Sequence, residues 1–118
     1  MIKIILLIIA ATLIVGCAGN QKIPRVYWGN YSETLYEVKK EPSVATKLSH
    51  KSELENIISK SLNWKILPPP GAYAELGKIY LEEGDRDRAM ANFNLEATSY
   101  PESKTLVALL LKNIEDAK

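Results

Sequence analysis

The sequence predicts an all-α fold: a short helical array with one αα-hairpin flanked by packing helices, after an N-terminal signal helix. Apolar residues recur at three- and four-residue spacing in several segments after residue 30, which is the period of a helix with one buried face. Prolines and glycines separate these segments, and both residue types end helices. A length of 118 residues leaves room for a single domain.

Residues 1–16 have the pattern of a secretory signal peptide. Lys3 precedes an unbroken apolar run over 4–15, and this run is shorter than the about 20 residues that a membrane-spanning helix needs. The segment Ile14-Val15-Gly16-Cys17 resembles the bacterial lipobox, in which a peptidase cuts before a cysteine that takes up diacylglycerol. We therefore expect cleavage before Cys17 and lipidation of Cys17. The alternative is an uncleaved anchor helix in which the cysteine has no role.

The lipid on Cys17 predicts where the mature protein resides. Two or three acyl chains, palmitate among them, hold a protein on a membrane because each buried CH₂ contributes about 0.8 kcal/mol. Ala18 follows the cysteine, and the absence of Asp there resembles the outer-membrane default of lipoproteins. We expect a lipid-anchored outer-membrane protein facing the periplasm, with residues 17–26 as the lipidated tether and residues 27–118 as the helical domain. Cys17 is the only cysteine, so the chain has no internal disulfide.

The helical domain begins with two predicted helices. The first covers about residues 31–41 and ends at a proline, and the second runs within residues 43–63. Ser52 and Glu55 fit a capping box, so the second helix is expected to begin or restart there. Three consecutive prolines and a glycine at 68–71 then stop it, because prolines lack the amide hydrogen that a continuing helix requires.

Residues 70–103 carry the most informative pattern in the domain. Their spacing resembles the tetratricopeptide repeat, an antiparallel helical hairpin, at Tyr73, Leu76, Gly77, Tyr80, Ala89, Phe93 and Pro101. Gly77 and Ala89 are small, which allows the two helices to approach closely. Gly84 is expected to close the first helix of the hairpin. Only one such repeat is found, so the helices before and after it must cover its apolar faces.

Glu96 departs from the repeat, because it stands where another small residue is usual. A carboxylate near the seam of a hairpin needs a partner or access to water. One interpretation is an ion pair at the edge of the hairpin. The other is a specific polar contact with a partner protein or with the tyrosines.

Two apolar clusters offer surfaces for a partner. Aromatic residues between 27 and 36 lie beside the tether, where they are either core residues or contacts near the membrane. The last helix, over about residues 103–117, carries apolar residues around a wide arc, which indicates packing between neighbours or a docking surface. The candidate partner-binding residues are therefore Trp28, Tyr31, Tyr36, Glu96, Leu109 and Leu111.

Charge and motif content argue against several functions. Without Lys3 the mature chain has 14 basic and 14 acidic residues, and this balance does not favour a nucleic-acid partner. His50, the only histidine, lies in a polar stretch and is interpreted as part of a solvated helix face. Metalloprotease and serine-nucleophile motifs do not occur in the sequence. We expect no catalytic residue, cofactor, metal site or small-molecule substrate, with loose metal binding at the acidic turn over 82–87 as a minor alternative.

The motifs YWG-x-Y-x₃-LY, PPG-x-YAELG, F-x₂-E and YPES resemble a family of small bacterial lipoproteins defined by domain of unknown function 4810. Such proteins tend to be encoded beside CsgG-like outer-membrane assembly lipoproteins. The resemblance implies membership in an envelope complex, with a CsgG-like lipoprotein as one possible partner, and implies no reaction. We therefore expect a non-catalytic interaction or assembly module of the cell envelope. The alternatives are a structural lipoprotein that links the outer membrane to peptidoglycan and an accessory to a cell-wall hydrolase.

Overall fold

The structure, a computed structural model, describes Met1 and residues 22–116. Within that part the chain forms five α-helices and one short 3₁₀ turn: α2 (Tyr31–Lys40), α3 (Val44–Asn63), α4 (Ala72–Glu82), α5 (Arg86–Ser99), η1 (Pro101–Ser103) and α6 (Lys104–Asp116). The described residues include no strand, so the predicted all-α class is confirmed. None of their helices is long and apolar enough to cross a membrane. The signal segment and Cys17 lie outside the described residues.

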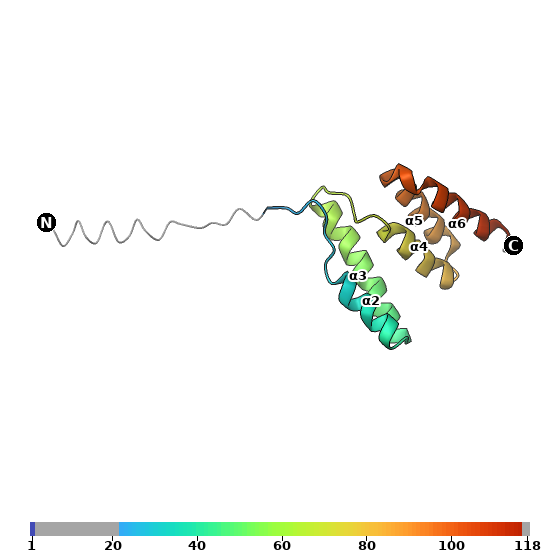
Figure 1. The fold of residues 1–118 in the computed structure, drawn as a ribbon, viewed down its shortest axis with the longest axis horizontal. Coiled ribbons are helices and arrows are strands. Elements are labelled where there is room, and N and C mark those ends of the chain that lie inside the picture. Colours follow the sequence, from blue (N-terminus) through green and yellow to red (C-terminus); the bar gives the residue numbers. More distant parts are fainter. Residues whose placement is uncertain (2–21, 117–118) are drawn as a thin grey trace.

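Helices α2 and α3 form the first hairpin (Figure 1). Ser43 caps α3: its hydroxyl accepts the amide hydrogen of Thr46, and the Thr46 hydroxyl accepts the amide hydrogen of Ser43. This reciprocal box satisfies two amides that a helix start leaves open. The helix runs without interruption from Val44, so the start predicted at Ser52 is wrong.

The end of α3 is closed by a left-handed residue. Lys65 has a φ of +57°. Its amide donates to the carbonyl oxygen of Leu62, and the next amide, of Ile66, donates to the carbonyl oxygen of Ser61, both at 3.0 Å. This is the Schellman arrangement, in which glycine is the usual residue at the left-handed position. The chain then crosses through the proline run to α4 (Figure 1).

Helices α4 and α5 form the second, tighter hairpin, as the sequence predicts. Gly84, with a φ of +83°, closes the turn between them, and Asp85 caps α5 by accepting the amide hydrogen of Arg88 at 3.0 Å. At the seam, a β-carbon added to Gly77 would lie 2.6 Å from the ring of Phe93. Only glycine permits this approach, so the close packing expected at Gly77 is confirmed.

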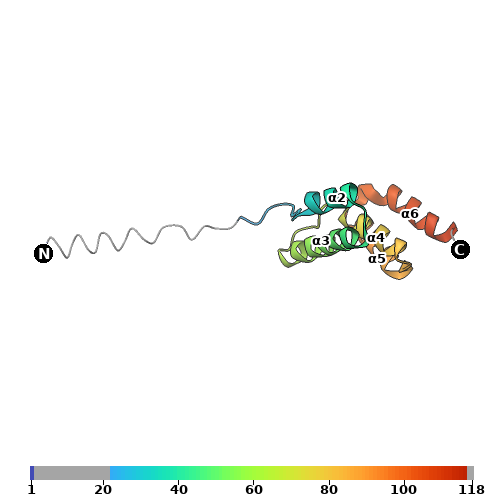
Figure 2. The same cartoon turned by 90° about the horizontal axis from the view of Figure 1, so that it is seen from below.

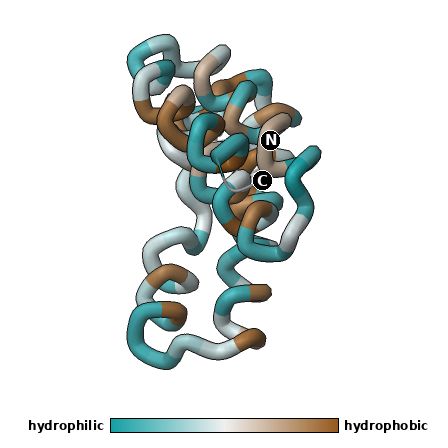
Figure 3. The backbone as a smooth tube through the Cα atoms, turned by 90° about the vertical axis from the view of Figure 1, so that its right-hand side faces the viewer, coloured by the Kyte–Doolittle hydropathy of each residue, from teal (hydrophilic) through white to brown (hydrophobic). Residues whose placement is uncertain are grey.

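One hydrophobic core joins α3, α4, α5 and α6. Its buried side chains are Leu54, Ile58, Ala72, Tyr73, Leu76, Tyr80, Ala89, Phe93, Val107 and Ile114. Figure 3 shows most hydrophobic positions in the upper half of the molecule, whereas the lower part has only separate hydrophobic segments among hydrophilic and neutral ones. Helix α6 covers α5 through Val107 and Ile114, and every buried hydrophobic side chain of the described residues lies between positions 54 and 114.

Candidate functional site: a groove between two helical hairpins

An open groove of about 490 Å³ lies where the α2–α3 hairpin diverges from α4. Its apolar side chains come from all three helices: Leu35, Val38, Val44, Leu48 and Ile79. Two of them are strongly exposed, since Val44 has 86% and Leu48 60% of its surface accessible. The groove is therefore lined by hydrophobic surface that the described part of the chain leaves uncovered.

Charged side chains of both signs surround this apolar lining. Lys39, Lys47 and Lys78 contribute positive charge, and Glu82 and Glu83 contribute negative charge. Near the lining, the ammonium group of Lys51 lies 2.7 Å from the carboxylate of Glu83, which links α3 to α4. An apolar groove with a mixed-charge rim suits a protein segment that has one apolar face.

His50 lies at the base of the groove and is only 4% exposed. The interpretation of His50 as part of a solvated helix face is therefore wrong. Its Nδ1 lies 2.8 Å from the hydroxyl of Thr34 on α2, and its Nε2 lies 2.9 Å from a carboxylate oxygen of Glu75 on α4. The sequence held a signal for this position, because His50 precedes the buried Leu54 and Ile57 by four and seven residues, on the same helix face.

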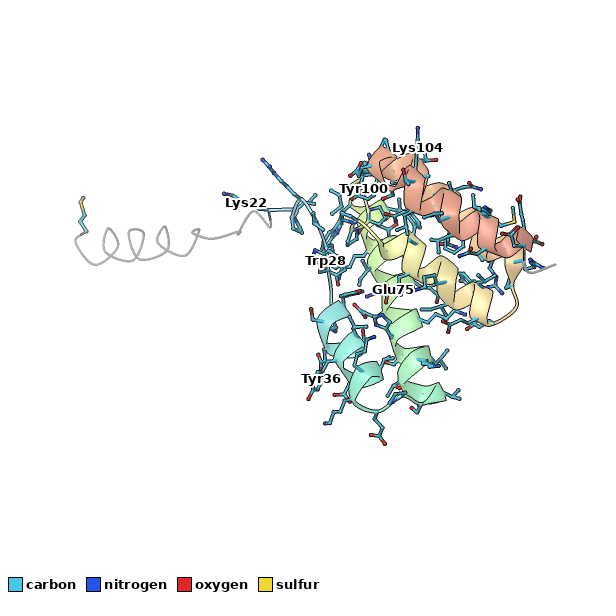
Figure 4. The ribbon with its side chains drawn as sticks, turned by 45° about the vertical axis from the view of Figure 1, so that its right-hand side comes forward. Lys22, Trp28, Tyr36, Glu75, Tyr100 and Lys104 are labelled. Carbon is cyan, nitrogen blue, oxygen red and sulfur yellow. The ribbon has the colours of Figure 1, made fainter. Side chains whose placement is uncertain are left out.

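Glu75 receives a second hydrogen bond from the opposite helix. The phenol of Tyr31 donates to the other carboxylate oxygen of Glu75 at 2.7 Å. Burial, this hydrogen bond and the negative charge of Glu75 raise the pKa of Tyr31 to about 12. Figure 4 shows Glu75 between α4 and the α2–α3 hairpin. One carboxylate thus holds α2, through Tyr31, and α3, through His50, against α4.

Thr34, His50 and Glu75 have the residue types of a hydroxyl–imidazole–carboxylate triad. Their surroundings differ from those of a nucleophile. The Thr34 hydroxyl also lies 3.2 Å from the carbonyl oxygen of Tyr31 and 3.3 Å from that of Asn30, inside α2. Acyl transfer needs free amide donors for the developing oxyanion, and the Thr34 amide is already bonded to the Asn30 carbonyl. This geometry favours a structural link between helices.

Glu96 is buried in the second hairpin, with 1% of its surface accessible. Its carboxylate accepts the amide hydrogen of Gly71 at 2.8 Å and lies 3.4 Å from both the amide of Ala74 and the hydroxyl of Ser103. These contacts replace both sequence interpretations, because the buried carboxylate bonds two backbone amides and a hydroxyl of this chain, and not a cation or a tyrosine. Gly71 is the residue before α4 and has no side chain to cap that helix. Glu96 therefore provides the cap from α5.

The same carboxylate affects two tyrosines. Burial raises the pKa of Tyr73, and the negative charge of Glu96 adds to this effect. Burial and the charge of Glu96 likewise raise the pKa of Tyr100. The phenol of Tyr100 donates to the carbonyl oxygen of Pro68 at 2.7 Å, so the end of α5 is tied to the proline run before α4.

Clusters of three or more His, Cys, Asp or Glu side chains that fit a metal ion are absent from residues 22–116. The family model for a domain of unknown function, DUF4810, matches residues 26–110 of the chain. The chain belongs to this family. The DUF4810 match spans both hairpins, so the groove, His50 and Glu96 all lie inside the family domain. No curated protein and no solved structure matches the chain.

The DUF4810 domain does not bring the six predicted partner-binding residues together. Trp28 is half-exposed near the tether, 5.2 Å from the ring of Tyr31, whereas Tyr36 is exposed near the far end of α2 (Figure 4). On α6, Leu109 is exposed and Leu111 is half-buried. The sequence pattern does not reveal the groove, because the lining combines three helices whose relative placement no local pattern encodes.

Proposed function

We propose that this protein is a lipid-anchored, non-catalytic docking module of the bacterial envelope, which binds a segment of another envelope protein in the groove between α2–α3 and α4. The observation that carries the proposal is the lining of that groove. Five apolar side chains from three helices line it, and Val44 and Leu48 are its most exposed members. Uncovered apolar surface of this kind on a small domain marks an interaction site.

The contacts of Glu75 support binding without rearrangement. Glu75 bonds both Tyr31 and His50, and Lys51 pairs with Glu83, so α2, α3 and α4 are cross-linked around the groove. A preformed groove loses little conformational entropy when it is filled, which favours affinity. The same cross-links give His50 and Glu75 a structural task that requires no reaction.

The rim predicts the chemistry of the bound segment. An amphipathic helix with apolar residues at three- and four-residue spacing would place them on Leu48 and Ile79. Acidic residues on that helix would face Lys39 and Lys47, and basic residues would face Glu82. Because family members tend to be encoded beside CsgG-like outer-membrane lipoproteins, such a lipoprotein is the first partner to test.

Lipid on Cys17 places the module at the outer membrane, facing the periplasm, in this proposal. The lipobox-like segment before Cys17 supports the anchor, and the absence of Asp after Cys17 supports the outer membrane. The anchor raises the local concentration of the groove near other membrane-bound proteins. A modest affinity of the groove then suffices for assembly.

The test is capture of the partner by full-length protein with a C-terminal tag, after mild crosslinking and detergent extraction. Leu48→Glu places a charge in the groove, and Leu95→Glu, at an exposed position on α5, is the matched control. We expect a stoichiometric partner with wild type and Leu95→Glu, loss of that partner with Leu48→Glu, and reduced capture with Cys17→Ala. Equal capture by Leu48→Glu would refute the groove as the docking site. Recovery with cell-wall sacculi in place of a protein partner would favour the structural lipoprotein.

A further inference from the structure

The end of the molecule where residues 22–29 enter carries an unusual set of exposed side chains. We call it the tether-side face. It comprises the exposed apolar residues Ile23, Val26, Trp28, Leu62 and Leu67 and the cationic residues Lys22, Arg25, Lys60 and Lys65. Figures 1 and 2 both show residues 22–29, the end of α3 and the start of the following connection at this end.

Aromatic contacts join the entering segment to the end of α3. The rings of Tyr27 and Trp64 meet edge to face with centroids 5.1 Å apart. The ammonium group of Lys60 lies 5.0 Å from the Tyr27 ring centroid and 5.3 Å from that of Trp64. These contacts hold the entering segment against the helical domain, so the face has a defined shape. Both tryptophans of the chain, Trp28 and Trp64, lie here.

Charge is distributed unevenly over the chain, and this face is cationic. Residues 22–32 and 59–74 contain no Asp or Glu but four basic residues, although the whole chain has a net charge of only +1. Glu53 on α3 lies beside this segment, where its carboxylate accepts the amide hydrogen of Asn30 at 2.8 Å. The positive charge is therefore concentrated where the chain leads back to Cys17.

Lys65 adds an independent observation. It occupies the left-handed position at the end of α3, with a φ of +57°, where glycine is free of strain. Strained residues persist where another requirement outweighs the strain, and such positions are frequent at functional sites. A cationic side chain at this position extends the charge of the face.

We propose that the tether-side face lies on the surface of a phospholipid bilayer that contains anionic headgroups. Tryptophan and tyrosine favour the boundary between headgroups and acyl chains, lysine and arginine are attracted to anionic headgroups, and exposed apolar residues insert between them. Four residues lie between Cys17 and Lys22, so the five steps of chain span at most about 17 Å. This inference rests on the lipid anchor of the proposed function, since that anchor brings the face to the bilayer.

Docking in this way orients the groove. Leu62 lies at the membrane end of α3 and Leu48 lines the groove 14 residues earlier, so the two are separated by about 20 Å along the helix. With the tether-side face on lipid, α3 carries the groove away from the bilayer toward soluble parts of neighbouring proteins. The lipid then supplies retention, and the face supplies orientation.

Vesicle binding by a lipid-free chain of residues 18–118, which lacks Cys17, tests the proposal. Every buried hydrophobic side chain of the described residues lies between positions 54 and 114, so this chain keeps the whole core, which circular dichroism verifies. The probes are vesicles of phosphatidylcholine alone and vesicles that also contain phosphatidylglycerol. We expect a blue shift of tryptophan emission and protection from acrylamide only with the anionic vesicles, and loss of both at high salt.

Charge reversal at the face gives the decisive comparison. Lys60→Glu/Lys65→Glu should weaken binding to anionic vesicles by about tenfold or more. Because Lys60 contacts two aromatic rings, Lys22→Glu/Arg25→Glu in the exposed entering segment provides a second variant that leaves the core untouched. Lys40→Glu/Lys112→Glu, with the same change in net charge at exposed positions elsewhere, should bind like wild type.

Three results would overturn the inference. These are no binding to either vesicle, equal binding by both face variants and wild type, and a dimer in light scattering that the face variants dissociate. The last result would assign the face to a second copy of the chain. Leu48-dependent capture of a protein partner is measured separately, so its persistence without vesicle binding would remove this inference and leave the proposed function standing.

Discussion

The carboxylate of Glu96 on α5 accepts the amide hydrogen of Gly71 at 2.8 Å, at the residue that precedes α4. The first amides of a helix have no partner within it, and Ser, Thr, Asp or Asn usually provides one from the N-cap position. Gly71 has a φ of +90° and no side chain, so the acceptor comes from the other helix of the hairpin. A negative charge at this place also interacts favourably with the helix dipole.

Glu96→Ala should therefore destabilise the domain by about 3 kcal/mol, because it leaves buried amides without an acceptor and creates a cavity. Glu96→Gln should cost less, about 1–2 kcal/mol, because one acceptor oxygen remains while the charge is lost. Urea unfolding followed by circular dichroism measures both values. Equal stability of wild type and Glu96→Ala would show that the amides gain nothing from the carboxylate.

Gly77→Ala should destabilise the domain by about 2 kcal/mol or more, although alanine is the better helix former. The added β-carbon would lie 2.6 Å from a ring carbon of Phe93 and 3.1 Å from the carbonyl oxygen of Ala89. The ring is fully buried and cannot move aside without repacking the core. Thermal unfolding of both proteins checks this prediction. A higher midpoint for Gly77→Ala than for wild type would contradict it, because the helix propensity of alanine would then outweigh the clash with Phe93.

The sequence predicted the second hairpin well because its packing is local. Gly77 meets Phe93 only sixteen residues along the chain, and Gly84 marks the turn between their helices. Spacing within one segment therefore encoded both the helices and their close approach. The predicted helix over about 103–117 likewise corresponds to α6, Lys104–Asp116.

The helix start predicted at Ser52 is wrong, although Ser52 and Glu55 fit the capping-box motif. Ser43 and Thr46 form the box that begins α3.

Interactions between the hairpins are not encoded in local sequence patterns. The polar neighbours of His50 predict a surface residue, whereas its burial depends on Glu75, twenty-five residues later. The sequence does not show which acceptor meets a histidine across helices, so neither the link through Glu75 nor the groove above it was predicted.

Tyr31 should make the domain lose stability at alkaline pH. Its pKa is raised from 10.0 to about 12 in the folded state, chiefly by burial and then by the hydrogen bond to Glu75. A pKa that is higher in the folded state contributes stability in full below the unfolded value, and this contribution is lost as pH rises from about 10 to about 12. The raised pKa values of Tyr73, Tyr80 and Tyr100 act in the same direction.

Tyr31→Phe separates this contribution from the others. Near neutral pH the variant should be less stable than wild type by about 1–2 kcal/mol, because Glu75 loses one hydrogen-bond donor. The difference should shrink as pH rises above about 10, because the phenol then ionises in the unfolded wild-type chain but stays protonated in the folded chain up to about pH 12. Urea unfolding across this range checks both statements. A constant difference between the two proteins would contradict the raised pKa of Tyr31.

Lys65→Gly should separate the stability of the domain from its interaction with lipid. Glycine adopts a φ of +57° without strain, so the variant should be more stable than wild type by about 0.5–1 kcal/mol in urea unfolding. The same change removes one of the four cations of the tether-side face, so binding to anionic vesicles should weaken about fivefold. Lys65→Arg is the matched control, because it retains both the strain and the charge. A variant that gains stability and still binds vesicles like wild type would show that the lysine at this position has no part in lipid binding.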